Sequence, residues 1–227
     1  MTFSLLARDE KTGALVAAAA TGAPCVGGWV IRGALGAGLV ASQGTAPSTL
    51  WRDEVLRRMG QGDTAPEAVS EVTAADPGRG DRQIGALDTM GRAAAFTGKD
   101  SVAMAAHETA ENCVVAGNML AEGPVLVALR EAWERGSGDP AERVLAALRA
   151  AADAGGDARG LQSAALLVLH PSFPPLDLRI DLSESPLADL ATLLRTARTP
   201  PYADWLKVVP VADDPHRAPV TAPPAAG

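Results

Sequence analysis

Two apolar runs without polar interruption place the strongest constraint on the fold. Residues 14–20 (ALVAAAA) and 164–169 (AALLVL) contain no charged or polar side chain. An extended strand directs alternate side chains to opposite faces, so strands of this composition must be covered on both faces. Both runs are far too short to cross a bilayer. The sequence therefore predicts strands that lie between two layers.

The connection between the first two strands indicates how those faces are covered. Residues 2–7 form another apolar run, and residues 8–13 (RDEKTG) are a polar segment that ends in glycine, which is typical of a hairpin. A doubly wound parallel sheet would need a helix after each strand instead. We therefore expect an α+β fold in which two antiparallel sheets stack with helices outside both, a four-layer αββα sandwich.

The rest of the chain alternates strand and helix patterns. Thr64, Pro66 and Glu67 are typical of a helix start, and glycine-containing turns separate the strands. Strands are expected at 2–7, 14–20, 25–32, 38–42, 83–88, 92–97, 163–170 and 176–182, with weaker ones around 103 and at 114–115. Helices are expected at 47–59, from 64 onward, and at 123–135, 140–152 and 186–196. We predict one domain over residues 1–209 and a mobile tail rich in proline and alanine, residues 210–227.

The composition limits the classes of partner that the protein is expected to bind. The 227 residues carry a formal net charge of −7, and the Lys and Arg residues do not cluster. Binding to a nucleic-acid backbone requires such clusters, so we expect no nucleic acid as partner, and an acidic surface also disfavours anionic membranes. The N-terminus lacks the basic region and long apolar segment of a secretory signal, which predicts a cytoplasmic location.

Cysteine and histidine give no sign of a metal site. Cys25 and Cys113 lie far apart, and His107, His170 and His216 are equally scattered. This spacing favours reduced thiols over a disulfide or a zinc site. We expect no metal and no other cofactor.

Thr2 has two interpretations. Threonine is a favoured strand residue, and position 2 need have no catalytic role. Removal of Met1, which a small second residue generally permits, would leave Thr2 with both a hydroxyl and a free α-amine. An amine with a reference pKa of about 7.7–8.0 can take the proton of the hydroxyl near neutral pH, so base and nucleophile would belong to one residue.

Several short motifs occur along the chain in a fixed order. They are TFSLLARD at 2–9 with TG at 12–13, ADPGR at 75–79, RQIG at 82–85, AAFTG at 94–98, AGNML at 116–120, GGD at 155–157 and QSAALLV at 162–168. In this order and spacing they resemble an uncharacterised family of Ntn-hydrolase-like proteins (N-terminal nucleophile hydrolases), domain of unknown function 1028, and the likeness runs over roughly residues 2 to 195. The resemblance implies an Ntn-type sandwich and a hydrolytic site at Thr2, and it implies no particular substrate.

The chain departs from this family where relatives place a polar or basic side chain after the second strand. Residues 20–22 are Ala, Thr and Gly, so no lysine or histidine stands there. A role that requires such a base at Thr21 is therefore in doubt. A non-catalytic relative that keeps the fold as a ligand-binding or interaction module is the alternative function.

An acyl-transfer site also needs donors for the developing oxyanion. Residues 42–44 (SQG) follow a strand and precede a helix, so the amides of Gln43 and Gly44 are candidates, although Ser42 and Gly44 could equally form a cap and a turn. Arg32 is the best-placed cation for the field around the amine, and a solvated surface arginine is its other interpretation.

The remaining candidates concern ligand binding and assembly. Asn118 lies at a strand end, where its amide could orient a substrate or the terminal amine, although a turn residue is its other interpretation. We expect it to contact a small-molecule or peptide substrate together with Thr21, Ser42 and Gln43. The pair at 162–163 opens a buried strand, so a hydrogen-bonding role in the core is expected there. Trp205 lies near the tail with little core left to fill, which suggests a homodimer.

Overall fold

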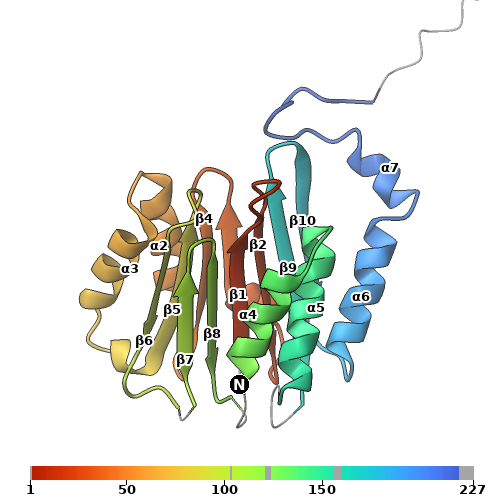
Figure 1. Ribbon diagram of the computed structural model, residues 1–227. Helices are drawn as coiled ribbons and strands as arrows, with labels where there is room; N and C mark the ends of the chain where they lie inside the picture. Colours follow the sequence, from red (N-terminus) through yellow and green to blue (C-terminus); the bar gives the residue numbers. More distant parts are fainter. Residues whose placement is uncertain (1, 103, 121–123, 156–159, 220–227) are drawn as a thin grey trace, which may run out of the picture.

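The computed structural model describes residues 2–102, 104–120, 124–155 and 160–219. Within these residues it is an α+β protein with two antiparallel sheets, as the hairpins predicted (Figure 1). The weak strand expected around residue 103, the expected helix start at residue 123, most of the GGD motif and the end of the tail lie outside the described residues.

The larger sheet has six strands in the order β10-β9-β2-β1-β8-β7. The first hairpin has the expected partners, since β1 and β2 pair antiparallel from Thr2↔Thr21 to Arg8↔Leu15. Every neighbouring pair in this sheet is antiparallel. Its strands are β1 (Thr2–Arg8), β2 (Leu15–Thr21), β7 (Ala106–Ala110), β8 (Cys113–Asn118), β9 (Ser163–His170) and β10 (Phe173–Ile180).

The smaller sheet has four strands in the order β3-β4-β5-β6, again all antiparallel. Its strands are β3 (Ile31–Ala34), β4 (Gly38–Gly44), β5 (Arg82–Asp88) and β6 (Ala93–Thr97). A single-turn 3-10 helix, Arg79–Asp81, leads into β5.

Helices cover the outer face of each sheet (Figure 1). Two pack on the four-stranded sheet, α2 (Thr49–Gly60) and α3 (Ala65–Ala74), and three on the six-stranded sheet, α4 (Val125–Arg135), α5 (Pro140–Asp153) and α6 (Pro186–Ala197). The helix start expected at Thr64 is confirmed, because Thr64 and Glu67 form a reciprocal capping box. Ser48 and Asp139 cap α2 and α5 through their side chains.

The uninterrupted apolar strands are explained by three core layers. Along β1, Phe3 and Leu5 contact the core under α4, α5 and α6, whereas Leu6 belongs to the core between the sheets. A third cluster, which includes Val40 and Val55, lies between the four-stranded sheet and α2 and α3. A strand with a core on each side can bury apolar side chains on both faces, so its sequence need not alternate apolar and polar residues.

The strand expected at residues 25–32 is wrong in its first half. Cys25 has a left-handed φ of 64° and is followed by the short helix α1 (Val26–Trp29), so the strand starts only at Ile31. Glycine permits this helix to lie tightly on β9 and β10, because a Cβ at Gly27 would lie 2.8 Å from both Ala165 Cβ and Arg179 Cγ. Ser163 Oγ, which accepts from Val26 N–H and donates to Ala23 O, has the expected hydrogen-bonding role in the core.

The end of the described chain folds back on the sandwich. After α7 (Tyr202–Leu206), Asp213 N–H donates to Pro171 O in the β9–β10 turn, and Arg217 donates to the carbonyls of Val209 and Leu206. The segment expected to be mobile from residue 210 therefore makes contacts as far as Arg217. Trp205 is 54% exposed on α7, and the homodimer stays a prediction.

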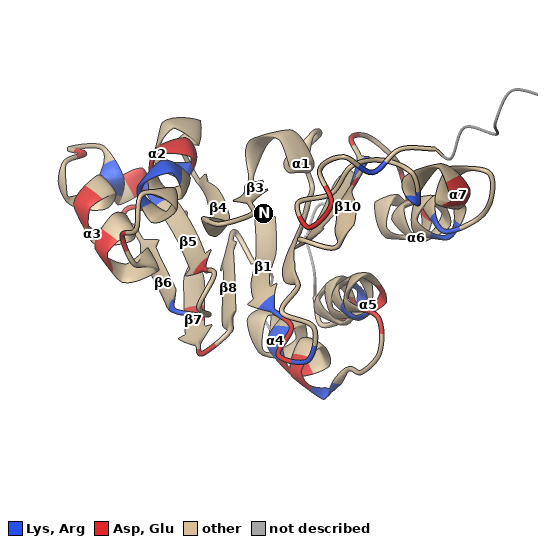
Figure 2. Cartoon of the chain, turned by 90° about the horizontal axis from the view of Figure 1, so that it is seen from above, with Lys and Arg blue, Asp and Glu red and all other residues tan. Residues whose placement is uncertain are grey.

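Charged residues lie mainly on the helices and turns, while the strands between the layers are almost free of them (Figure 2). In the part of the chain that the structure describes, no helix has both the length and the apolar character needed to cross a membrane.

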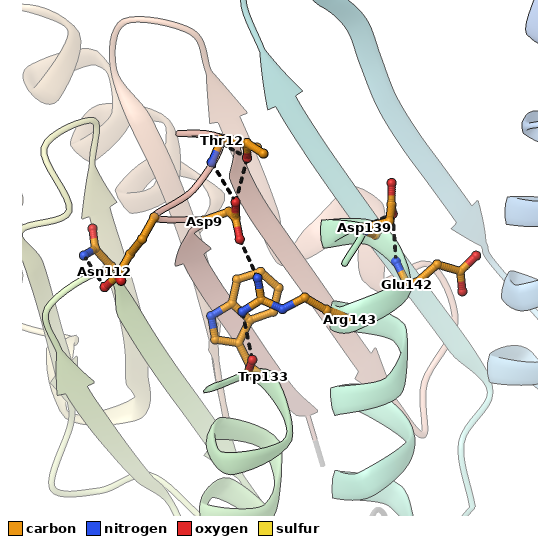
Figure 3. Close-up of polar contacts among 10 residues, drawn as sticks. Asp9, Thr12, Asn112, Trp133, Asp139, Glu142 and Arg143 are labelled. Carbon is orange, nitrogen blue, oxygen red and sulfur yellow. Dashed lines mark hydrogen bonds and ion pairs between the residues drawn. The ribbon is translucent and has the colours of Figure 1, made fainter. Parts of the chain in front are cut away.

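A buried ion pair closes the end of the sandwich where the β1–β2 turn lies (Figure 3). Asp9 accepts hydrogen bonds from the Thr12 amide at 2.9 Å and the Thr12 hydroxyl at 2.7 Å, and its other oxygen accepts from Arg143 on α5. The Arg143 guanidinium lies 3.9 Å from the centre of the Trp133 ring and donates to Trp133 O. This cluster joins the first hairpin to α4 and α5.

Candidate functional site

At the opposite end of the sandwich, polar side chains from the inner faces of both sheets come together. Thr2 opens β1 and pairs with Thr21, the last residue of β2, and with Asn118, the last residue of β8. Leu6 and Val114, an even number of residues away, belong to the core between the sheets. Since side chains alternate along a strand, Thr2, Thr21 and Asn118 face the second sheet. These strand ends lie near the N label in Figure 1.

The second sheet contributes two glutamines to the same end. Gln43 on β4 pairs with Gln83 on β5, and Ala41 and Leu87, an even number of positions away, belong to the core between the sheets. Both glutamines are buried, Gln43 to 2% exposure and Gln83 to 0%. Buried amides of this kind require hydrogen-bond partners.

A cavity of about 410 Å³ lies at this end of the sandwich. This volume suits a small ligand. Among the described residues, none that lines the cavity carries a charge. The lining residues are Thr2, Thr21, Ala23, Pro24, Val26, Trp29, Val30, Gln43, Gly44, Pro47, Asn118 and Met119. The structure thus brings together Thr2, Thr21, Gln43, Gly44 and Asn118 of the residues predicted from the sequence.

The hydroxyl of Thr2 lies 3.1 Å from that of Thr21. The two residues are direct cross-strand partners, so the strand register fixes this contact. The Thr21 hydroxyl therefore lies beside Thr2. Thr21 ends the second strand, where the family resemblance implied a polar or basic side chain. Thr21 can orient the Thr2 hydroxyl, but it is no base at neutral pH.

Gln83 organises the amides of the site. Its Nε2 lies within hydrogen-bond distance of Ala106 O at 3.0 Å and Gly117 O at 3.1 Å, as well as of Thr97 Oγ1 at 2.8 Å. Because carbonyl oxygens only accept, this end of the Gln83 amide must be the nitrogen. Its Oε1 then accepts from Gln43 Nε2 at 2.7 Å and from Asn118 Nδ2 at 3.4 Å.

Gln83 therefore fixes the orientation of the two amides that line the cavity. Gln43 presents its nitrogen to Gln83, and its Oε1 is buried without a hydrogen-bond partner among the described residues. Gln83 was not among the site residues expected from the sequence. A polar residue that directly precedes the apolar run 84–87 of a predicted strand, within the RQIG motif, is the signal that could have identified it.

Two predicted site residues lie elsewhere. Ser42 is fully buried on the outer face of its sheet, and its hydroxyl donates to Ser48 O at 2.8 Å, which holds the start of α2. Arg32 pairs with Val40, which contacts the core under α2 and α3, so Arg32 also points to the outer face. Neither residue lines the cavity. Both are one position out of phase with the inward-facing residues of their strands.

The cavity wall formed by α1 is held by a residue that was not expected to belong to the site. Arg52 on α2 is 4% exposed, and its Nη1 donates to the carbonyls of Gly28 and Trp29 at 2.8 and 2.9 Å. Trp29 itself is 54% exposed. The helix backbone is thus anchored, while the tryptophan ring remains accessible at the cavity.

The backbone at the rim is unusual at two positions. Gly44 has a φ of 123°, and a Cβ there would lie 2.8 Å from the carbonyl oxygen of Asp81, so a side chain would displace the chain at the end of β4. Met119, directly after Asn118, has a φ of 53° although it is not glycine. Such backbone outliers are enriched at binding and catalytic sites.

Cys113 and His107 are poorly placed for chemistry at this cavity. Burial raises the pKa of the Cys113 thiol to about 12, so it is a protonated, unreactive thiol at neutral pH. His107 does not line the cavity, and its Nδ1 lies 2.8 Å from Thr97 Oγ1, one of the partners of Gln83. Burial lowers the pKa of His107, which favours the neutral ring.

Comparison with known proteins places the chain in a family. The family model DUF1028, described as a family of unknown function, matches residues 2–190. Among solved structures, the crystal structure of a DUF1028 protein from Silicibacter pomeroyi has 48% sequence identity and a TM-score of 0.90, over 96% of this chain and 98% of that one. No curated protein matched the sequence. The chain belongs to DUF1028, a family of unknown function.

Proposed function

We propose that the protein is an N-terminal nucleophile amidohydrolase that cleaves an amide-type C–N bond of a small molecule or peptide through Thr2, after removal of Met1. One observation carries this proposal: Thr2 lines a cavity of about 410 Å³ together with Gln43 and Asn118, and no charged side chain is among its described lining residues. Two stacked antiparallel sheets with helices outside both are also the arrangement expected of Ntn hydrolases, which supports the assignment.

The uncharged cavity favours the α-amine of Thr2 as the base. An α-amine with its ordinary pKa of about 7.7–8.0 is partly unprotonated near neutral pH, and a carboxylate beside it would stabilise the ammonium form. Among the described residues that line the cavity there is no carboxylate. The free amine would therefore be populated at neutral pH without help from a lysine or histidine.

The chemical steps need only Thr2, the substrate and water. Thr2 Oγ1 attacks the carbonyl carbon while its proton passes to the α-amine. The C–N bond then breaks, the proton passes to the leaving nitrogen, and an ester joins the acyl group to Oγ1. Water, deprotonated by the same amine, attacks the ester, releases the carboxylic acid and restores the hydroxyl.

Gly44 is the best candidate for stabilising the oxyanion. Ser42 N–H donates to Val30 O at 3.0 Å, and alternate residues of a strand direct their N–H groups to the same side. The Gly44 N–H should therefore point past Val30 toward Trp29. Trp29, Val30 and Gly44 all line the cavity. A backbone donor fixed at this position would bind the oxygen of a tetrahedral intermediate.

Mass spectrometry tests this proposal in two steps. The purified protein should lack Met1, and incubation with a panel of small amides and cyclic ureas should add the mass of an acyl group to the N-terminal peptide at Thr2. Retained Met1 would leave Thr2 without a free amine and would contradict the proposal. Ligand binding without any acylation across the panel would favour a non-catalytic binding module.

A further inference from the structure

The chemical character of the cavity limits which amides it can hold. Pro24, Trp29, Val30, Pro47 and Met119 form an apolar part of the wall. No charged side chain is present among the described lining residues to pair with a ligand charge. A carboxylate or phosphate placed there would lose its hydration without a cationic side chain to compensate.

The buried oxygen of Gln43 adds a specific requirement. Gln83 holds the nitrogen of this amide at 2.7 Å, so the side chain cannot turn its nitrogen toward a ligand without losing that bond. Gln43 Oε1 is left as a buried acceptor that no described group satisfies. A ligand N–H is the group that such an acceptor favours.

We propose that the substrate is an uncharged amide or urea with at least one N–H group and an aromatic or apolar substituent, whose N–H donates to Gln43 Oε1 while its apolar part lies against Trp29. The inference rests on the proposed function, since it names the substrate class of the same cavity. It makes Gln43 a residue that determines specificity, positioned by Gln83.

Three probes of similar shape test the two requirements separately. They are 2-phenylacetamide, which is neutral and has N–H groups, N,N-dimethyl-2-phenylacetamide, which is neutral without N–H, and phenylacetate, which is anionic. Dissociation constants would be measured by ligand-observed NMR titration of the full-length Thr2→Ala protein, because this variant cannot turn the probes over. We expect 2-phenylacetamide to bind about tenfold more tightly than the dimethyl amide, and phenylacetate to bind more weakly still.

Gln43→Leu, made in the Thr2→Ala protein, tests the acceptor directly. It should remove the difference between the two neutral amides, whereas Gln61→Leu, at an exposed residue beyond the end of α2, should leave the difference intact. If Gln43→Leu fails to fold because Gln83 loses a partner, the comparison of the three probes in the Thr2→Ala protein still decides. N-methyl-2-phenylacetamide controls for bulk and should bind like the unsubstituted amide.

Equal binding of the two neutral amides, tighter binding of phenylacetate, or no binding of 2-phenylacetamide would overturn the inference. These outcomes are separate from the test of the proposed function. If the expected order of binding is found but no amide acylates Thr2, the substrate class stands as a ligand class and the hydrolase proposal fails. If Thr2 is acylated without a preference for N–H, the hydrolase proposal stands and the role of Gln43 fails.

Discussion

Thr2→Ala should abolish measurable turnover of any amide that acylates the wild-type protein. We expect kcat to fall by about 10⁴-fold or more, which is the scale of the loss when a catalytic nucleophile is removed. Folding should be nearly unaffected, with a change in the free energy of unfolding of about 1 kcal/mol or less, because a partly exposed residue at a strand end contributes little to the core. Steady-state kinetics and urea unfolding measure the two effects.

Thr2→Ser is the matched variant that keeps the nucleophile. Serine retains the hydroxyl and is small enough to permit removal of Met1, so part of the activity should remain. The wild-type rate should also fall as the pH drops below the pKa of the α-amine, because the ammonium form cannot accept the hydroxyl proton. Thr109→Ala, on the exposed strand β7, should change neither rate nor pH profile. Equal turnover by Thr2→Ala would place the catalytic group elsewhere.

Arg143→Ala should destabilise the fold by about 3 kcal/mol, the lower end of the range for breaking a buried ion pair by removing one partner. Asp9 is 4% exposed and would keep its charge without the guanidinium, and Trp133 would lose the cation above its ring. The lower end applies because both charged groups also line a polar cavity at this end of the sandwich. Urea unfolding measures the loss.

Arg198→Ala provides the control, since Arg198 pairs with Asp139 and Glu142 near the start of α5 but is about one-third exposed. Exposed pairs of this kind contribute about 1 kcal/mol or less. A loss from Arg143→Ala no greater than that from Arg198→Ala would contradict a structural role for the Asp9–Arg143 pair.

The same pair should give the stability a recognisable pH dependence. Burial acts to raise the pKa of Asp9, but the hydrogen bonds from Thr12 and the charge of Arg143 outweigh it and lower this pKa below its usual 3.8. A lowered pKa in the folded state stabilises the protein above the usual pKa, and this contribution disappears as the pH falls through the folded value. The stability difference between wild type and Asp9→Asn should therefore be largest near neutral pH and shrink below about pH 4.

The architecture could be predicted because it depends on local patterns. Uninterrupted apolar strands and short glycine turns are visible within a few residues, and they indicated two antiparallel sheets and the β1–β2 hairpin. The helix α1 was missed because Val26, Trp29 and Val30 suit a strand equally well. The helix depends on two features that a strand pattern does not reveal. Cys25 has a left-handed backbone, and Gly27 packs closely against Arg179, more than a hundred residues away in sequence.

The site could be predicted only in part, for a related reason. In a strand that is apolar on both faces, the pattern does not indicate which residues point inward, so Ser42 and Gln43 were both proposed although only Gln43 reaches the cavity. Arg32, which was also proposed, points to the outer face of its sheet and does not line the cavity. Gln83 was missed because its partners come from other strands, which meet only in the folded protein.

The contacts of Gln83 also determine which parts of the cavity can be redesigned. The Gln83 side chain, on the smaller sheet, contacts the carbonyls of Ala106 and Gly117 on the larger sheet. It also contacts the two amides that line the cavity, those of Gln43 and Asn118. The length of this one side chain therefore sets the distance between the two sheets at the site. Substitutions in the strands would disrupt the contacts of Gln83 before they enlarged the cavity. A change of ligand size is instead accessible at Trp29, Pro47 and Met119, which line the cavity from outside the strands.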